Sequence, residues 1–288
     1  MIRLLRELQA RLRTAGLPEG EALDLLAKAS RLSRKDLLLR LAQPPPPGTA
    51  ERALALLEKR LTGYPLQYLL GEVEFFGLPL KVAEGVLIPR PETEGLVELS
   101  LNLPLPERPR LLDVGTGTGA IALALKKHLP EAQVWATDTD PKALALAREN
   151  ASRLGLEVTF LQASLTGGVK DLDLIVSNPP YLPEAYRTQA PQELAFESPQ
   201  ALYAGREGLD VARPLAEEAA EALRPGGFLL LELAPENVGL LAEELKASGW
   251  TDVEVLRDLL GRDRYLRARR PPEEAEGEEG RLHRPHLP

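Results

Sequence analysis

The stretch "LLDVGTGTGAIALAL", residues 111–125, decides the fold of this chain. A short apolar run ends at a glycine-rich turn, and a second apolar run with helical spacing follows it. Gly115, Gly117 and Gly119 thus lie between a predicted strand and a predicted helix, where the backbone can approach a ligand and a helix N-terminus can face it. A purely structural tight turn would show the same residues, so the loop alone is a weak signal.

Apolar strands alternate with amphipathic helices from residue 110 onward. The predicted strands are residues 110–114, 133–137, 157–161, 172–176, 228–233 and 252–256, and the predicted helices are 120–128, 142–154, 210–223 and 237–248. This alternation indicates an α/β fold in which helices cover both faces of a parallel sheet.

Two acids near the glycine loop indicate its ligand. The spacing is G-x-G-x-G, not the G-x-G-x-x-G of dinucleotide sites, and Asp113 precedes it at the strand end. An acid there would repel phosphate but suits a ligand with an amino group and a sulfonium. Asp138, about twenty residues further on, can accept hydrogen bonds from both ribose hydroxyls. These residues predict S-adenosylmethionine, although without the glycines Asp138 would be interpreted as a solvated loop acid or helix cap.

The fourth predicted strand runs into Asn178, Pro179, Pro180 and Tyr181. A planar amide or conjugated NH₂ group is a poor nucleophile, so its methylation requires acceptors that hold the nitrogen in line with the methyl group. The Asn178 side-chain oxygen and the Pro179 carbonyl can accept the two N–H groups, Pro180 stiffens the turn, and Tyr181 can pack against the target. A strand end capped for ordinary turn reasons is the alternative interpretation.

Residues 1–63 carry helical signals only and predict a small helical domain. The predicted apolar faces are Ile2, Leu5, Leu8 and Leu12 in the first helix and Leu23, Leu26 and Ala27 in the second. Ser33 and Asp36 resemble a capping box for a third helix, and Thr49 is the expected cap of a fourth. Residues 64–95 are predicted to be a connector with a β-hairpin, 96–270 the α/β domain, and 271–288, with few apolar residues, a disordered tail.

Composition excludes several classes of protein. The chain has no cysteine, which excludes disulfides, thiolate metal sites and a cysteine nucleophile, and no metal site is predicted. The net charge of -8 gives no electrostatic footprint for a nucleic-acid backbone. Charges interrupt the N-terminal segment where a signal peptide needs an apolar run, and no run has the length of a membrane span. A cytoplasmic protein is expected.

The segment "GYPLQYLLGEVEFFGLPLKVAEGVLIPRPETEGLVE", residues 63–98, resembles the signature of the HemK/PrmC family of release factor glutamine methyltransferases. The resemblance extends through "DLLGRDRYLRAR", residues 258–269, and so covers most of the chain. It implies an enzyme that methylates the glutamine of the Gly-Gly-Gln motif in class 1 peptide chain release factors. It also implies a helical domain joined by a β-hairpin to a Rossmann-like, seven-stranded methyltransferase domain.

The resemblance also implies roles for single residues. The residues that match the cofactor motifs are Gly115, Thr116, Gly117, Thr118, Gly119 and Asp138, and Asn178 to Tyr181 match the glutamine-binding motif, with Asn178 against both ligands. Asp113, Arg90, Pro91 and Thr93 are expected to line the same cavity, while a structural ion pair between Arg90 and Glu92 is equally open.

The chain departs from the family pattern in three places. The segment "QASL" has Leu165 where an acid and an aromatic are common, so adenine contacts there are expected to be apolar or through the backbone. Ser198 stands where proline is usual, and "LELAPEN" lacks the usual glycine. These departures concern local contacts and leave the predicted reaction unchanged.

Two other hypotheses stay open. An adenine N-methyltransferase acting on nucleic acid would share the Asn178 chemistry but should show a basic groove with stacking groups. A cofactor-binding scaffold without activity is the non-enzymatic reading, against which the intact Asn-Pro-Pro-Tyr sequence argues.

Overall fold

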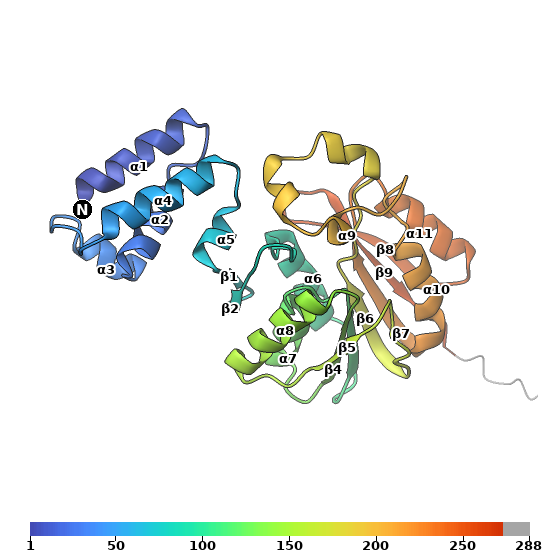
Figure 1. The fold of residues 1–288 in the computed structure, drawn as a ribbon. Helices are drawn as coiled ribbons and strands as arrows, with labels where there is room; N and C mark the ends of the chain where they lie inside the picture. Colours follow the sequence, from blue (N-terminus) through green and yellow to red (C-terminus); the bar gives the residue numbers. More distant parts are fainter. Residues whose placement is uncertain (273–288) are drawn as a thin grey trace, which may run out of the picture.

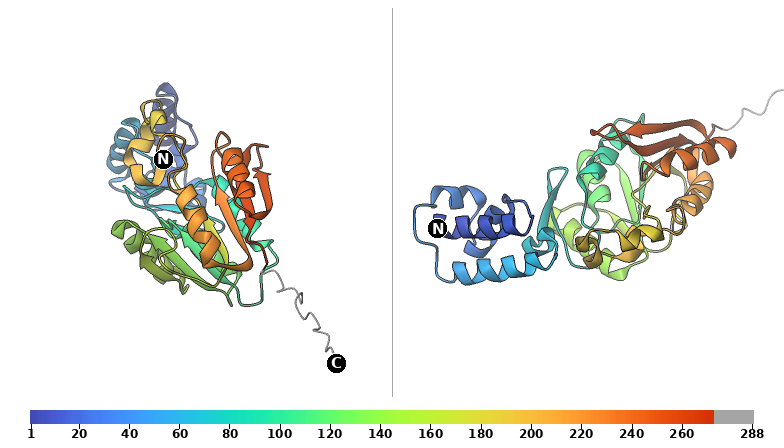
Figure 2. Two further views of the ribbon diagram at one scale, coloured as in Figure 1. Left: turned by 90° about the vertical axis from the view of Figure 1, so that its right-hand side faces the viewer. Right: turned by 90° about the horizontal axis from the view of Figure 1, so that it is seen from above.

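The structure is a computed structural model that describes residues 1–272. A helical part at the N-terminus stands at one end of an elongated molecule, and a three-layer α/β part forms the other end (Figures 1 and 2). Of the tail predicted for residues 271–288, residues 273–288 lie outside the described part. Within the described part, no helix has both the length and the apolar content needed to cross a membrane.

Seven strands form the main sheet in the order β5-β4-β3-β6-β7-β9-β8. Their bounds are β3 Arg110–Val114, β4 Gln133–Asp138, β5 Thr159–Gln162, β6 Leu172–Ser177, β7 Leu223–Glu232, β8 Thr251–Arg257 and β9 Asp263–Arg269. The first five strands pair in parallel, whereas β9 pairs antiparallel with both β7 and β8. The predicted parallel sheet is thus present in these five strands, whereas the β9–β8 edge is antiparallel because a short hairpin leads from β8 back into the sheet as β9, which the strand pattern did not show.

Helices cover both faces of this sheet, as the alternation predicted. On one face lie α6 (Pro91–Leu101), α7 (Ala120–His128) and α8 (Pro141–Leu154), packed on a cluster that includes Leu111, Leu174 and Leu230. On the other face lie α10 (Ala212–Ala222) and α11 (Val238–Ala247), packed on alternate residues of the same strands. This alternation follows from the two-residue period of a strand.

Parallel register brings three strand ends to one edge of the sheet. Val114 of β3 lies opposite both Thr137 of β4 and Ser177 of β6. The next residues of these strands therefore leave the sheet side by side, at the carboxyl edge where α/β proteins bind their ligands.

The N-terminal part contains α1 (Ile2–Thr14), α2 (Glu21–Ser30), α3 (Arg34–Leu39) and α4 (Thr49–Leu61). The Ser33 side chain caps α3 by accepting from the Asp36 amide at 3.0 Å, which confirms the predicted cap. Thr49 is not the cap of α4, because Gly48, with a φ of 80°, occupies that position. Its positive φ suits glycine better than threonine.

Two predicted apolar faces were partly wrong. Ile2 is 40% exposed, because Met1 and Leu4 fill the core beside Leu5 and Leu8. In α2 the buried face is rotated from the predicted one: Ala22, Leu25, Leu26 and Ala29 are buried, whereas Leu23 and Ala27 are half-buried. Tyr64, Tyr68, Val82 and Ile88 complete this helical core from the connector.

The connector contains the predicted β-hairpin, formed by β1 (Glu72–Phe75) and β2 (Leu78–Lys81). A short helix that the sequence did not predict, α5 (Leu66–Leu70), precedes it. Arg60 at the end of α4 is buried and its Nε lies 2.6 Å from the Glu21 carboxylate. The Arg60 Nη1 lies 3.3 Å from Glu193, which belongs to the segment that follows β6, so one guanidinium joins the helical part to the α/β part.

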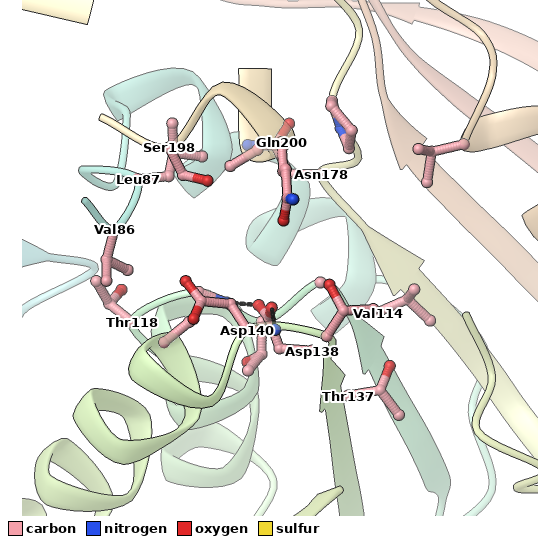
Figure 3. Close-up of a pocket in the computed structure, with 18 of the residues that line it drawn as sticks. Val86, Leu87, Val114, Thr118, Thr137, Asp138, Asp140, Asn178, Ser198 and Gln200 are labelled. Atoms are coloured by element: carbon pink, nitrogen blue, oxygen red, sulfur yellow. Dashed lines mark hydrogen bonds between the residues drawn. The ribbon is translucent and has the colours of Figure 1, made fainter. Parts of the chain in front are cut away.

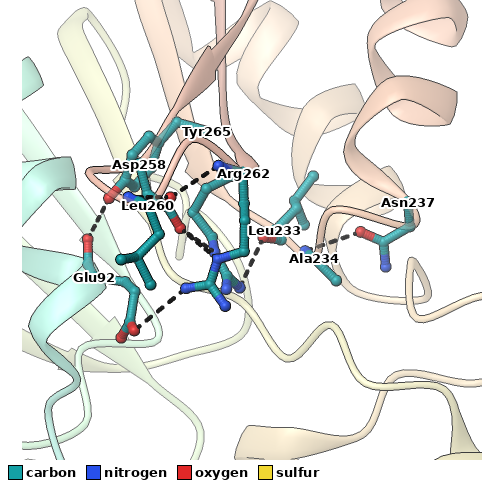
Figure 4. Close-up of polar contacts among 9 residues, drawn as sticks. Glu92, Leu233, Ala234, Asn237, Asp258, Leu260, Arg262 and Tyr265 are labelled. Atoms are coloured by element: carbon teal, nitrogen blue, oxygen red, sulfur yellow. Dashed lines mark hydrogen bonds and ion pairs between the residues drawn. The ribbon is translucent and has the colours of Figure 1, made fainter.

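The turn between β8 and β9 and the beginning of β9 contact the start of α6 (Figure 4). The Tyr265 hydroxyl donates to the Glu92 carbonyl at 2.5 Å, and Arg262 lies 3.6 Å from the Glu92 carboxylate. The Asp258 carboxylate rigidifies this turn by accepting from the amides of Leu260 and Arg262 at 2.9 and 3.0 Å.

Gly95 in α6 provides a test of this contact. A Cβ atom there would lie 2.3 Å from the Tyr265 hydroxyl oxygen, and Tyr265 is 3% exposed and held by Glu92. In Gly239→Ala the added Cβ of α11 meets nothing within 4 Å, so this variant measures the helix-propensity gain alone, about 0.5–1 kcal/mol. We expect Gly95→Ala to be less stable than Gly239→Ala by about 1–3 kcal/mol in urea denaturation. Equal stability of the two variants would contradict the packing of Tyr265 on α6.

Candidate active site

A cavity of about 390 Å³ lies at the carboxyl edge of the sheet, between the ends of β3, β4 and β6 (Figure 3). The predicted site residues that line it are Thr93, Gly115, Thr116, Gly117, Thr118, Asp138, Leu165, Asn178 and Pro180. The cavity lining does not include Asp113, Arg90, Pro91, Gly119, Pro179 or Tyr181. The structure therefore brings together most of the residues selected from the sequence, and the others surround them.

The glycine loop presents backbone to the cavity. Gly115 and Gly117 have φ angles of 70° and 56°, and a Cβ atom at either would meet nothing within 4 Å. Glycine is required there for conformation, because positive φ strains other residues. Gly119 also has a positive φ, 86°, and a Cβ atom there would lie 3.2 Å from the Ala147 Cβ, so this glycine in addition allows α7 to pack closely on α8.

Asp138, the last residue of β4, is hydrogen-bonded to the glycine loop. Its Oδ2 accepts from the Gly117 amide at 2.9 Å and its Oδ1 accepts from the Asp140 amide at 3.0 Å. Burial raises the pKa of Asp138, and these backbone hydrogen bonds oppose the rise. Each oxygen keeps a lone pair free, so the carboxylate can also accept from a ligand hydroxyl in the cavity.

Asp113 lies beneath the glycine loop and is 1% exposed. Its Oδ2 accepts from the Thr116 hydroxyl at 2.7 Å and from the Ala122 amide at 3.3 Å, while its Oδ1 has no partner among the described residues. Burial raises the pKa of this carboxyl to about 7. In this structure Asp113 supports the loop from below, whereas the sequence predicted a place in the cavity lining.

Asn178 faces Asp138 across the cavity (Figure 3). Its side-chain Nδ2 donates to the Thr93 hydroxyl at 3.4 Å, but its Oδ1 is buried and has no partner among the described residues. An unpaired buried acceptor costs about 1–3 kcal/mol, so proteins rarely keep one without a use. The oxygen predicted to receive the target N–H is thus an acceptor without a protein donor.

Tyr181 lies behind the turn, with its ring half-buried against the core beneath α10 and α11. Its carbonyl accepts from the Asn237 side chain at 3.1 Å, and Gly208 leaves no room for a side chain against that carbonyl. Burial, followed by the nearby Glu232, raises the pKa of Tyr181 to about 12. In this structure Tyr181 therefore anchors the turn, and its packing against a target group stays a prediction.

Arg90 and Glu92 do not pair with each other, so that alternative was wrong. Arg90 Nη2 lies 2.5 Å from Glu197, which is 3% exposed and also accepts from the Ile88 amide at 2.8 Å. Glu92 instead pairs with Arg262 in the turn between β8 and β9. Two residues apart at a helix start, the side chains diverge and meet different segments.

The segment that follows β6 contributes to the cavity, which the sequence did not predict. It contains two 3₁₀ helices, Glu184–Thr188 and Gln192–Phe196, and α9, Pro199–Leu202. Its Ser198, Gln200 and Ala201 line the cavity, as do Val86 and Leu87 of the connector, and Ser198 lies beside Leu87 (Figure 3). The stretch "FESPQAL", residues 196–202, contained the signal, because Glu197 is an acid that directly follows the apolar residues 194–196 and so needs a partner if it is buried.

Comparison with known proteins places the chain among methyltransferases. Residues 3–71 match the PrmC N-terminal domain family, and residues 95–207 match the Methyltransferase small domain family. The chain is 52% identical over 271 residues to a release factor glutamine methyltransferase of Deinococcus radiodurans, covering 93% of this chain and 97% of that protein. A protein of the same name from Moorella thermoacetica is 43% identical over 262 residues, covering 89% of this chain and 93% of its own length.

Solved structures share the fold at low identity. A Pyrococcus furiosus methyltransferase is similar with a TM-score of 0.53 and 22% identity, covering 77% of this chain and 98% of its own. A Thermus thermophilus 16S rRNA methyltransferase in complex with AdoMet and guanosine is similar with a TM-score of 0.50 and 21% identity, covering 69% of this chain and 49% of its own. These likenesses concern the fold alone.

The raised pKa of Asp113 predicts a pH-dependent stability. Because the folded-state pKa, about 7, lies above the ordinary value of 3.8, the folded state binds the proton more tightly. The stabilisation by the protonated carboxyl is complete below the ordinary pKa and is lost as the pH rises through the folded pKa. Relative to Asp113→Asn, which does not titrate, the wild type should lose up to about 4 kcal/mol of unfolding free energy over this range. Urea denaturation of both proteins at a series of pH values checks this, and a constant difference would contradict it.

Proposed function

The chain belongs to the release factor glutamine methyltransferases, and from this premise we propose that it methylates the glutamine of the Gly-Gly-Gln motif in class 1 peptide chain release factors. The methyl group goes from S-adenosylmethionine to the side-chain amide nitrogen. The observation that supports this most directly is the unpaired Oδ1 of Asn178, a residue that lines the cavity together with the Gly115–Gly117 loop.

The residues present fit S-adenosylmethionine. Asp138 is placed to accept from the ribose hydroxyls, and the open backbone of Gly115 and Gly117 provides room for the amino-acid part. Leu165 and Ala143 give the lining an apolar wall for the adenine, in place of the acid and aromatic common in this family. When bound, S-adenosylmethionine supplies an electrophilic methyl group on a positively charged sulfonium.

The chain's own residues prepare the target nitrogen. Because the lone pair of an amide nitrogen is delocalised, the nitrogen reacts well only when it is held in line and can rehybridise. Asn178 Oδ1 accepts one N–H of the glutamine, and the Pro179 carbonyl accepts the other. The two prolines keep both acceptors in place, since neither residue can rotate freely about φ. No strong general base is needed, because the nitrogen becomes acidic once methylated and then loses its proton.

The partner is a protein, and the helical part, residues 1–63, is its proposed docking domain. The net charge of -8 does not favour a nucleic-acid backbone as ligand. The adenine N-methyltransferase alternative is not favoured, because the curated relatives named here are release factor glutamine methyltransferases. We place the reaction in the cytoplasm, where release factors act.

Replacing Asn178 by Ala tests the reaction. The variant should lose about 10²–10³-fold in kcat because the target nitrogen loses an acceptor, while S-adenosylmethionine should still bind. Asn102→Ala, an exposed site at the end of α6, is the matched control and should keep full activity. The measurement is mass spectrometry of an unmethylated class 1 release factor, read for one methyl group on the Gly-Gly-Gln glutamine. Undiminished turnover by Asn178→Ala would refute the role of this amide.

A parallel reaction with a duplex oligonucleotide tests the substrate class. Methyladenine in the oligonucleotide without methylation of the release factor would refute the proposed function. The expected result is methylated glutamine and unmodified adenine.

Replacing Asp138 by Ala tests the cofactor site. Loss of hydrogen bonds to a charged acceptor typically costs about 1.5–3 kcal/mol, so the Kd for S-adenosylmethionine should rise about 10–100-fold in titration calorimetry. Asp24→Ala, on the surface of α2 away from the cavity, is the control and should bind normally. Normal binding by Asp138→Ala would remove this residue from the site.

A further inference from the structure

Glu232 is a buried carboxyl group beside the proposed active site to which the mechanism above assigns no role. It is the last residue of β7 and is 0% exposed. Because Ser177 of β6 lies opposite Leu231 of β7 in parallel register, the residues that follow, Asn178 and Glu232, leave the sheet next to each other. Glu232 shares a strand face with Leu230, which packs on the side of the sheet covered by α6.

The environment of Glu232 is unusual for an acid. Neither carboxyl oxygen has a hydrogen-bond partner among residues 1–272. Burial raises the pKa of Glu232 to about 7, and the neighbouring Thr93 hydroxyl and Arg264 oppose the rise. The contact with Thr93 falls short of hydrogen-bond geometry in this structure, yet the hydroxyl is close enough to influence the carboxyl. A buried acid without partners is costly, which indicates a use for it at this site.

Thr93 connects this acid to Asn178. The Thr93 hydroxyl is buried, lies on the first turn of α6 and accepts from Asn178 Nδ2 at 3.4 Å. A hydroxyl has one hydrogen to donate, and the neighbouring Glu232 carboxyl, when ionised, is available as its acceptor. In this series of hydrogen bonds, the Asn178 amide donates to the Thr93 hydroxyl and the Thr93 hydroxyl donates to Glu232.

This direction determines which end of the Asn178 amide faces the cavity. With Nδ2 bonded to Thr93, Oδ1 is left without a partner among the described residues and is available to accept the target N–H. Rotated by half a turn, the amide would present Nδ2, which cannot accept a hydrogen bond. A Glu232 carboxylate that accepts from Thr93 therefore favours the orientation of the Asn178 amide in which Oδ1 is available to the target.

Several contacts hold the start of α6, which carries Thr93, in a fixed position. The start of α6 is held by Tyr265, whose hydroxyl donates to the Glu92 carbonyl at 2.5 Å, and Tyr265 lies opposite Glu232 in the β7–β9 register (Figure 4). Arg90, just before α6, is held by Glu197. The elements that carry the hydroxyl, the amide and the carboxyl are thus joined by strand pairing between β6, β7 and β9 and by the Tyr265 hydrogen bond to the start of α6.

We propose that Glu232 is a positioning residue for methyl transfer, which through the Thr93 hydroxyl holds the Asn178 amide with its oxygen toward the target nitrogen. The expected effect on kcat rests on the proposed function. The orientation of the Asn178 amide rests on the structure alone. Glu232 does not touch the substrate and acts only through its two neighbours.

The protonation state of Glu232 should govern this orientation. When ionised, the carboxylate can only accept, so Thr93 donates to it; when protonated, it can donate to Thr93 and compete with the Asn178 amide. The charged and titratable groups that face it are Arg264 and Tyr265 from β9, Arg90 and Glu92 at the start of α6, and Tyr181 after β6. The pKa values of Tyr181 and Tyr265 are raised above their ordinary value, so neither tyrosine titrates near neutrality. The kcat of the wild type should rise with pH through the pKa of Glu232.

The kinetic test compares Glu232→Gln, Thr93→Val and the double variant. Each single variant keeps the size of the side chain and should lower kcat about 10–100-fold, since misplacement of a reacting group costs on this scale. The Kd for S-adenosylmethionine should stay within about threefold of the wild-type value. The kcat of the double variant should be no lower than that of the poorer single variant, because both substitutions interrupt the same series of hydrogen bonds. Thr93→Ser restores the hydroxyl and should recover at least about tenfold over Thr93→Val. Glu236→Gln, an exposed acid after the same strand, is the control and should keep full activity.

A second measurement reads the amide without any reaction. The chain has asparagine only at 102, 150, 178 and 237, so ¹⁵N-asparagine labelling gives four side-chain NH₂ signals, assigned by substitution. The Asn178 signal should shift with pH as Glu232 titrates in the wild type, and this shift should disappear in Glu232→Gln and Thr93→Val. The exposed Asn102 provides an internal reference that should not follow this titration.

The outcomes separate this inference from the proposed function. If the wild type methylates no release factor, the proposed function fails, while the Asn178 signal still decides whether Glu232 orients the amide. If the signal ignores pH and both substitutions, the inference is overturned whatever the activity. Additive losses in the double variant, or an acid limb of kcat that persists in Glu232→Gln, would also overturn it.

Discussion

Parallel pairing of β3 with β4 and β6 is the constraint on which the rest of the structure depends. Because Val114 stands opposite both Thr137 and Ser177, the residues that follow these three strands leave the sheet side by side at its carboxyl edge. The glycine loop, Asp138 and Asn178 are far apart in the chain but enclose one cavity for this reason. A slip of one residue in any of these strands would turn its side chains to the opposite face and dismantle the site.

The segment after β6 ties the remaining parts of the molecule to this edge. Its buried Glu197 binds the Ile88 amide and Arg90, and its Glu193 meets Arg60 at the end of the helical part. Breaking one member of a buried ion pair leaves an uncompensated charge, so these contacts hold the connector firmly against the cavity. The helical part is therefore positioned relative to the site by the same segment that carries the Asn-Pro-Pro-Tyr turn.

Several buried polar atoms without partners gather around the site. Asn178 Oδ1, Asp113 Oδ1, both Glu232 oxygens and Arg264 Nε have no hydrogen bond in the described part of the chain. A core selected for stability alone would not keep such groups, because each costs free energy of folding. Their concentration beneath one edge of the sheet is typical of a protein that retains unsatisfied groups where it binds and reacts.

The sequence by itself determined the fold class, the glycine loop, Asp138, Asn178 and the family, because each depends on local patterns: strand and helix periodicity, positive φ at glycine, and the rigidity of two prolines. Only the tertiary structure decided that β9 runs antiparallel, that Arg90 meets Glu197 and not Glu92, and that Asp113 and Tyr181 lie behind the cavity lining. It also placed Glu232 behind Thr93, next to Asn178. These facts depend on strand order, register and helix packing, which join residues far apart in the chain, and no local pattern contains that information.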